Sequence, residues 1–375
     1  MATIKIIHSA DWQLGKPFGR FPAEVRAALA EARLDAIDRI AEAARVAGAG
    51  HVLVAGDVFD NVEPGDRIML QAMARMERSP ARWWLMPGNH DYARAGGLWS
   101  RVRARATGNV QVVDTATPLE LEEGAWLLPA PLEHRKTSTD PTAAMVEMVT
   151  PAGALRIGLA HGSITEFGAS GDGANLIPPD RARLAGLDYL ALGDWHGFLT
   201  IGDRTAYSGT PEVDRFGREE AGACIAVTIR SAEPPAVERI ATGRYRWLSR
   251  RWEVGGAQDL TREIDALRQE GRLADMLLDL RLSGIASLSD RVAMTALLDD
   301  MLAHELRYLD VDAQALIAHP TPEDVAAIDV RGALGAAAAT LREQAEGQGP
   351  GAALAGAALE RLYVETLRYD RGDAQ

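Results

Sequence analysis

The chain has 375 residues, of which 47% are hydrophobic and 25% charged, a globular composition that excludes a disordered protein. It is longer than one ordinary domain, so a large domain and one or two smaller units are expected. The net charge is −13, residues 1–240 hold 25 basic and 31 acidic residues, and residues 241–375 hold 15 and 22. Neither part therefore carries the overall basic character that is usual among autonomous DNA-binding proteins.

The sequence contains no signal that predicts a membrane or export. No apolar run is long enough to span a bilayer, and residues 1–10 lack the pattern of an export signal. Cys224 is the single cysteine and lies in an apolar run, which predicts a buried strand thiol in a reducing compartment. These features predict a cytoplasmic protein with no membrane partner.

Short apolar runs alternate with amphipathic stretches over the first 230 residues, which is typical of α/β architecture. Residues 22–48 are predicted to form a helix, because a proline opens this segment and a glycine closes it. A second helix is predicted at residues 67–78. Strands are predicted at residues 4–8, 51–55, 83–86, 155–160, 189–192, 205–208 and 224–229.

The pattern changes after about residue 240, where helical and strand segments alternate more loosely. Helices are predicted at residues 258–269 and 289–305, and strands at residues 276–282 and 306–311. Two alanine-rich helices follow at residues 323–346 and 352–369, separated by a glycine-rich break. The expected division is therefore 1–240, 241–320 and 321–375.

Side chains that can bind metal ions follow five of the predicted strands. They are Asp11 and Gln13, Asp57 and Asp60, Asn89 to Asp91, His161, and Asp194 and His196. The loops beyond the carboxyl ends of strands converge in open α/β sheets, so these five clusters can meet at one site. Residues two apart in an extended segment point the same way, so Asp11 and Gln13 can face one metal ion, as can Asp194 and His196.

Five segments resemble the motifs of a known family. They are Ser9–Gly15, Gly56–Asp60, Gly88–Asp91, Ala160–Gly162 and Gly193–His196. Together they resemble the five motifs of the calcineurin-like metallophosphoesterases. Within that superfamily, the tryptophan at position 12 and the segment Tyr207–Glu212 resemble SbcD-type and YhaO-type DNA repair exonucleases. The resemblance implies a four-layer α/β/β/α sandwich in residues 1–240, a small α/β capping domain in residues 241–320, and C-terminal helices in residues 321–375.

The resemblance also implies two metal positions and a catalytic histidine. The first position would use Asp11, Gln13, Asp57 and His196, and the second Asp57, Asn89, His161 and Asp194. Asp57 would bridge both ions, and His90 would act near the scissile phosphate. Asp60 and Asp91 are expected to contact the ligand side chains rather than the metal ions. For Asp91, a turn-forming role is the alternative.

Two positions depart from the family pattern, which usually has histidine where Gln13 and Asp194 stand. A neutral amide is a poor ligand, whereas the carboxylate of Asp194 favours hard ions over zinc. Two divalent ions are therefore expected. Mn²⁺ is the favoured metal, and Mg²⁺ is the alternative. The alternative interpretation of the two departures is partial loss of catalysis.

The function implied by the resemblance is a metal-dependent phosphodiesterase, an exonuclease or endonuclease that processes DNA beside an SbcC-like or YhaN-like SMC-type ATPase. The C-terminal helices would either dock on the coiled coil of that ATPase or pack on their own unit. A homodimer is a further possible assembly. The rival functions are hydrolysis of a small nucleotide, which suits the acidic charge, and a catalytically weakened scaffold. Trp12 and Trp195 would either stack on bases or pack beneath the loops.

Overall fold

The computed structural model describes residues 2–106, 108–165, 173–217, 219–321, 323–324, 333–347 and 349–370. The chain divides into two compact units, Met1–Arg246 and Trp247–Gln375. Within the described ranges, none of the helices combines the length and the apolar character needed to cross a membrane. The separation of residues 241–375 into a capping domain and a helical tail stays a prediction.

The first sheet of the N-terminal unit has six strands in the order β14-β13-β1-β2-β3-β4. The strands are β1 (Thr3–Ser9), β2 (His51–Val54), β3 (Arg82–Leu85), β4 (Val110–Val112), β13 (Ala223–Arg230) and β14 (Ala236–Ala241). Strands β1 to β4 are parallel to one another, whereas β13 pairs antiparallel with both β1 and β14. The carboxyl ends of β1, β2 and β3 therefore lie at one edge of this sheet.

The second sheet also has six strands, in the order β11-β12-β10-β7-β6-β5. The strands are β5 (Leu119–Glu122), β6 (Ala125–Ala130), β7 (Leu155–His161), β10 (Tyr189–Gly193), β11 (Leu199–Ile201) and β12 (Thr205–Tyr207). Strands β6, β7, β10 and β12 are parallel. A short pair, β8 (Ser163–Ile164) and β9 (Leu176–Ile177), follows β7.

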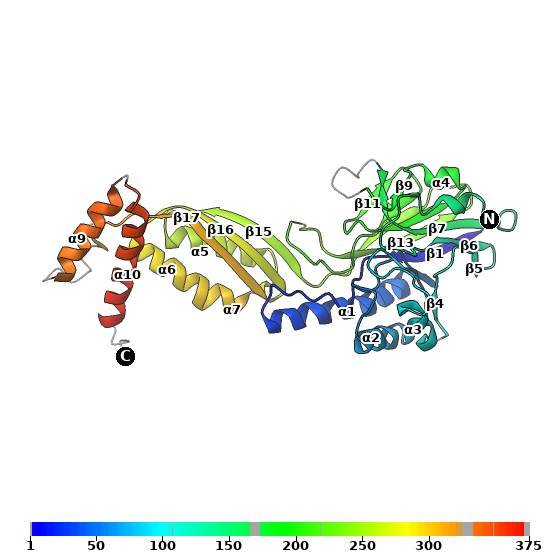
Figure 1. The fold of residues 1–375 in the computed structure, drawn as a ribbon, viewed down its shortest axis with the longest axis horizontal. Coiled ribbons are helices and arrows are strands. Elements are labelled where there is room, and N and C mark those ends of the chain that lie inside the picture. The colour runs from blue at the N-terminus through cyan, green and yellow to red at the C-terminus, as the bar shows by residue number, and fades with distance from the viewer. Residues whose placement is uncertain are drawn as a thin grey trace. The chain divides into compact units, whose positions relative to one another are not determined.

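Helices cover the outer faces of the two sheets (Figure 1). They are α1 (Ala23–Ala47), α2 (Asp66–Glu77), α3 (Leu98–Arg105), α4 (Arg181–Leu184) and the 3-10 turn η1 (Ala143–Val146). One core joins the first sheet to α1, α2 and α3 through residues such as Ile37, Val52 and Met69. A second core lies between the sheets, and a third joins the second sheet to η1 and α4. The layers are α/β/β/α, which confirms the predicted fold class.

Helix α1 shows why its ends could be predicted from sequence. It begins directly after Pro22, whose ring fixes φ at −55°, and ends at Gly48, which has a φ of +67°. Glycine adopts this left-handed conformation without steric cost, and its N–H bonds the carbonyl oxygens of the last helical turn. The residues that face the sheet, Val25, Leu29, Ile37 and Ile40, are all buried.

The C-terminal unit contains a three-stranded sheet in the order β15-β16-β17. Its elements are β15 (Arg246–Glu253), α5 (Ala257–Gln269), η3 (Leu273–Asp275), β16 (Met276–Ala286), α6 (Leu288–Ala296), η4 (Leu297–Leu302), α7 (Ala303–Glu305), β17 (Tyr308–Ala318), α9 (Ala333–Glu346) and α10 (Ala352–Asp370). The single helix predicted at residues 289–305 is present, but six residues of it form the π-helical segment η4. Of the predicted helix at 323–346, residues 323–324 are helical and Ala333–Glu346 forms α9, whereas residues 325–332 lie outside the described residues.

Helix α10 packs against its own unit. Leu359 and Tyr363, one turn apart, are buried together with Leu288 and Ala338, and Arg291 pairs with Glu360 at 3.1 Å. The side chain of the third residue predicted on this stripe, Leu367, lies outside the described residues. Docking and packing on the same unit were the two alternatives for the C-terminal helices. At Leu359 and Tyr363, α10 packs on its own unit.

Candidate metal centre

The loops that follow β1 and β2 are joined by backbone hydrogen bonds beyond the ends of the strands. The N–H of Asp11 donates to Gly56 O at 3.1 Å, and the N–H of Gln13 donates to Asp57 O at 2.8 Å. Among the described residues, seven that are not glycine have a positive φ, and Asp11, Gln13, Asp57 and Asp194 are four of them. Such backbone conformations are costly and persist where surrounding contacts enforce them, which is common at functional sites.

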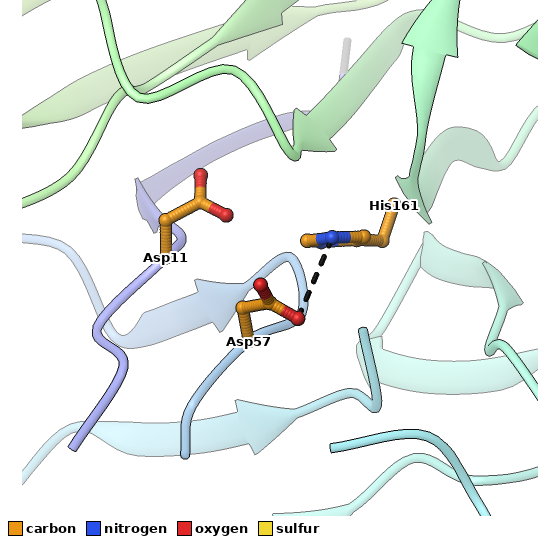
Figure 2. A group of neighbouring side chains, drawn as sticks. All are labelled: Asp11, Asp57 and His161. Carbon is orange, nitrogen blue, oxygen red and sulfur yellow. Dashed lines mark ion pairs between the residues drawn. The ribbon is translucent and has the colours of Figure 1, made fainter. Parts of the chain in front are cut away.

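Three of the predicted ligands form a compact cluster (Figure 2). Asp11, Asp57 and His161 are buried, and one ligand atom from each lies within 4.8 Å of the others. The Nδ1–H of His161 donates to Ala55 O at 2.8 Å, which leaves Nε2 as the atom that faces the cluster. This Nε2 atom lies 3.5 Å from Oδ1 of Asp57. The predicted convergence of the β1, β2 and β7 loops is therefore observed at these three residues.

The charges of the cluster change the pKa values of its members. Burial alone lowers the pKa of His161, but the carboxylates of Asp57, Asp11 and Asp194 together raise it to about 9. Burial raises the pKa of Asp11 to about 6. The metal-free cluster thus retains protons that a bound cation would displace, because metal ligation requires the deprotonated forms.

Asp194 and Asn89 lie at the edge of this cluster. Nδ2 of Asn89 donates to Oδ1 of Asp194 at 3.1 Å, and the hydroxyl of Ser163 donates to Oδ2 of Asp194. The Oδ1 atom of Asp194 lies 3.8 Å from Nε2 of His161. Nε2 of His161 and Oδ1 of Asn89 are both buried without a hydrogen-bond partner. Buried polar atoms are normally paired, so two unpaired ligand atoms beside clustered carboxylates fit a divalent cation.

His90 lies beside the cluster with its ring held in one orientation. Its Nδ1–H donates to the backbone carbonyl of Asp60 at 2.9 Å, and its backbone N–H donates to Oδ1 of Asp57 at 2.9 Å. Nε2 lies 4.0 Å from Oδ2 of Asp57, and the side chain is about one-third exposed. The contact that Asp60 makes with His90 is through its backbone carbonyl rather than its carboxylate.

Asp91 ties the loop after β3 to the loop after β2. Its carboxylate is fully buried and accepts from Gly88 N at 2.7 Å and from Phe59 N at 3.0 Å. The indole N–H of Trp99 donates to its backbone carbonyl. Burial raises the pKa of Asp91 to about 7. Asp91 therefore shapes the turn that presents Asn89 and His90, which is the turn-forming alternative of the sequence analysis.

The first predicted metal position has a different environment. Nε2 of Gln13 lies 3.4 Å from Nε2 of His196, and Oε1 of Gln13 accepts from Nζ of Lys16 at 3.0 Å. Lys16 also donates to Asp214. The same Oδ2 atom of Asp214 lies 3.4 Å from Nη2 of Arg33 and 3.5 Å from Nδ1 of His196.

Sequence reasoning missed Lys16, Arg33 and Asp214. Lys16 follows Gln13 by three residues, and this short spacing could have indicated that the two side chains are in contact. Arg33 was visible as a charged residue on the apolar side of the first predicted helix, where a cation needs a partner. Asp214 carried no signal, because its approach to Lys16 spans 198 residues of sequence.

The segment Tyr207–Glu212 supports the loops that carry the ligands. The hydroxyl of Tyr207 donates to Gly162 O at 2.7 Å, directly after His161. The hydroxyl of Thr210 donates to Asp11 O at 2.9 Å. Glu212 accepts from the backbone N–H groups of Arg244 and Tyr245 at 2.8 and 2.9 Å. This segment therefore stabilises the loops that carry Asp11 and His161 through hydrogen bonds to their backbone carbonyls.

The two tryptophans next to ligand positions differ in exposure. Trp12 is 1% exposed, donates to Ser9 Oγ at 2.9 Å and packs edge-on against Trp83 at 5.9 Å. The prediction that Trp12 stacks on bases is therefore wrong, because its ring lies in the core. The alternative, that Trp12 packs beneath the loop, is the one observed. Trp195 is 44% exposed, and its stacking role stays a prediction.

A cleft of about 940 Å³ opens beside the cluster. Its lining includes His90, Asp194, Trp195, Arg135 and Lys136. The cleft therefore brings the basic side chains of Arg135 and Lys136 and the ring of Trp195 to the same depression as His90, together with carboxylates that include Glu219 and Glu220.

One comparison with known proteins finds a similarity in the N-terminal part of the chain. Residues 4–166 match the calcineurin-like phosphoesterase family. The match supports the metallophosphoesterase superfamily, and with the Asp11, Asp57 and His161 cluster it points to metal-dependent phosphoester hydrolysis. The match ends before β10, so Asp194 and His196 lie beyond it.

The other two comparisons add no information on function. The comparison with curated proteins gives no match. One protein of known crystal structure aligns with 64% of this chain and 100% of its own chain, at 10% identity and a TM-score of 0.40. That similarity is too low to support an argument about fold or function.

Proposed function

We propose that this chain is a two-metal phosphodiesterase whose substrate is DNA. The observation that carries the proposal is the position of His90, which lies 4.0 Å from the Asp57 carboxylate and lines a cleft that also contains Arg135 and Lys136. The resemblance of the motifs to SbcD-type and YhaO-type exonucleases supports DNA as the substrate. Mn²⁺ is the proposed ion, because Asp194 provides a hard oxygen ligand where the family pattern has an imidazole.

The proposed ligands divide into two sets that share Asp57. Asp11, Gln13 and His196 complete the first set, and Asn89, His161 and Asp194 complete the second. The unpaired atoms of Asn89 and His161 support the second set. Bound divalent ions would supply Lewis acidity toward a phosphoryl oxygen.

The residues of the chain would position and protonate the substrate. Because Nδ1 of His90 is committed to the Asp60 carbonyl, Nε2 is the ring atom that can pass a proton to the departing oxygen as water displaces it from phosphorus. Arg135 and Lys136 would bind neighbouring phosphates. Trp195 would stack on a base at the mouth of the cleft.

The acidic net charge supports the need for a partner. A charge of −13 opposes tight DNA binding by the chain alone, because contacts to phosphates contribute most of that affinity. We propose that an SbcC-like or YhaN-like ATPase supplies the remaining DNA contacts. The faces of α9 and α10 that do not pack on their own unit would contribute to the contact with it. A second copy of the chain is the alternative partner.

The test compares substrates and variants under one set of conditions. Labelled single-stranded DNA, labelled duplex DNA, a cyclic nucleotide and a small phosphodiester are incubated with the full chain and Mn²⁺ or Mg²⁺. Hydrolysis of DNA that disappears in His90→Ala and persists in His304→Ala supports the proposal, because His304 is an exposed histidine of the C-terminal unit. Preference for the cyclic nucleotide would favour the small-substrate function. Absence of turnover on every substrate would favour the scaffold function.

A further inference from the structure

The two proposed metal positions differ in the charges that surround them. In the second position, Nε2 of His161 lies 3.5 Å from a carboxylate oxygen of Asp57 and 3.8 Å from one of Asp194. Near Gln13 and His196 the neighbours include the cations Lys16 and Arg33. A cation repels a second cation more strongly in a partly buried site than in water, because the effective dielectric constant is lower.

The side chain of Gln13 is already engaged by Lys16. The ammonium of Lys16 donates to Oε1 of Gln13 at 3.0 Å, and this oxygen is the atom that Gln13 would offer to a metal ion. The amide nitrogen, which cannot ligate, is the atom that faces Nε2 of His196 at 3.4 Å. A divalent ion in this position must therefore displace Lys16 from Gln13 and separate Gln13 from His196.

Asp214 holds the lysine in this place. Nζ of Lys16, Nη2 of Arg33 and Nδ1 of His196 all approach Oδ2 of Asp214, so this buried carboxylate anchors Lys16. Arg33 is 2% exposed and reaches the same carboxylate oxygen. Arg33 is also offset by the carboxylates of Glu212, Asp60 and Asp11, so the ammonium of Lys16, 3.0 Å from Oε1 of Gln13, is the cation that lies directly at the first metal position.

We propose that Lys16 takes the place of a tightly bound ion at the Gln13 and His196 position, so that the chain holds one divalent ion tightly and a second one weakly. The tight ion lies among Asp57, His161 and Asp194, with Asp11 and Asn89 within reach. Lys16 is thus a positioning residue that sets metal stoichiometry. This inference rests on the proposed function only in taking these residues as metal ligands.

The test counts bound ions in the full chain. Metal-free protein is titrated with Mn²⁺, and bound and free ions are measured by electron paramagnetic resonance and by elemental analysis after gel filtration. The wild-type chain should bind one Mn²⁺ tightly, and a second at least about tenfold more weakly, given the repulsion between close cations. Lys16→Met should strengthen binding of the second ion by at least about tenfold, whereas Lys16→Arg, which retains the charge, should leave it weak.

Lys5→Met is the matched control, because Lys5 is an exposed lysine on β1 that donates to Ala47 O at 3.3 Å. It should change neither affinity. Two equally tight ions in the wild-type chain would overturn the inference, and so would an unchanged second affinity in folded Lys16→Met. If Lys16→Met does not fold, Lys16→Arg decides the question. Tighter binding of the second Mn²⁺ to that variant would overturn the inference. One tight ion without hydrolysis of any phosphodiester would leave this inference standing and remove the proposed function.

Discussion

The ring of His90 is fixed by the backbone carbonyl of Asp60, which accepts the Nδ1–H of that ring at 2.9 Å. This bond spans the loops after β2 and β3 and leaves Nε2 at 4.0 Å from the nearer Asp57 oxygen. Because the acceptor is a backbone atom, its position depends on the fold of the loop and not on the Asp60 side chain. The ring is therefore oriented toward the cleft before any substrate binds.

Replacement of His90 should separate chemistry from metal binding. His90→Ala should lower kcat for phosphodiester hydrolysis by about 10²–10⁴-fold, the range typical of a general acid or base, while the number of bound ions stays the same. Kinetic assays with elemental analysis of the same samples check this. A loss smaller than tenfold with metals retained would contradict a role for His90 in proton transfer.

Replacement of Asp57 should remove metal binding. Asp57→Asn keeps the shape of the side chain but halves its acceptor capacity, in a cluster where Asp57 faces both His161 and His90. We expect loss of the tight ion and of hydrolysis, with a folded chain by circular dichroism. Asp203→Asn is the control, since Asp203 is an exposed carboxylate in the turn between β11 and β12. Retention of the wild-type number of ions by Asp57→Asn would contradict the ligand assignment.

The metal preference should depend on Asp194. Asp194→His replaces an anionic oxygen ligand with an imidazole, which suits zinc better than manganese. The ratio of Mn²⁺ to Zn²⁺ affinity should therefore fall in the variant. Titration of both proteins with each metal at one pH measures the ratio. An equal ratio would mean that Asp194 does not ligate the ion. The same comparison with Gln13→His would then show whether Gln13, the other departure from the family pattern, is a ligand.

His8 should make the stability of the metal-free chain depend on pH. His8 is fully buried between the sheets, with Nδ1 2.8 Å from the Tyr189 hydroxyl and Nε2 3.1 Å from Leu192 O. Burial lowers its pKa from 6.5 to about 3. Because the folded pKa lies below the unfolded pKa, the stability is fully present above pH 6.5 and falls as pH drops toward 3, by about 1.4 kcal/mol per pH unit.

Urea unfolding at pH 6.5 and pH 5 checks this contribution. In chelator, the wild-type chain should lose about 2 kcal/mol more than His8→Gln over this interval. Tyr189→Phe is the control, because it removes the hydroxyl that contacts His8 but keeps the titrating ring. Equal losses in the wild-type chain and His8→Gln would show that His8 does not contribute.

Gly193 should be intolerant of a side chain. A Cβ at this position would lie 1.9 Å from Ala55 O and 2.8 Å from Nδ1 of His161, so Gly193→Ala must displace the bond between those two groups. We expect a loss of roughly 1–3 kcal/mol of stability, as for overpacked cores, and weaker metal binding. Gly50→Ala, where nothing lies within 4 Å of the added Cβ, should bind metal normally. Normal metal affinity in Gly193→Ala would show that His161 can shift without cost.

The sequence by itself determined part of the fold, including α1 and the strands β1, β2, β3, β7 and β10, and it predicted that Asp11, Asp57 and His161 meet at one site. Proline, glycine and apolar periodicity mark the ends of α1 and the strands that precede each cluster, because those signals act within a few residues of the chain. The convergence of Asp11 and Asp57 followed from the rule that parallel strands bring their carboxyl ends to one edge of a sheet. His161 follows β7 of the second sheet and meets them because the two sheets pack against each other. These features are local in sequence or follow from sheet topology.

Only the tertiary structure decided how each residue is used. Trp12 and Trp195 stand in equivalent places beside a ligand, yet one is buried against Trp83 and the other is 44% exposed. Asp214 approaches Lys16 across 198 residues, and no periodicity encodes that contact. Burial and charge pairing depend on which distant segments pack together, so exposure, pKa and the charge beside each metal position could not be obtained from sequence.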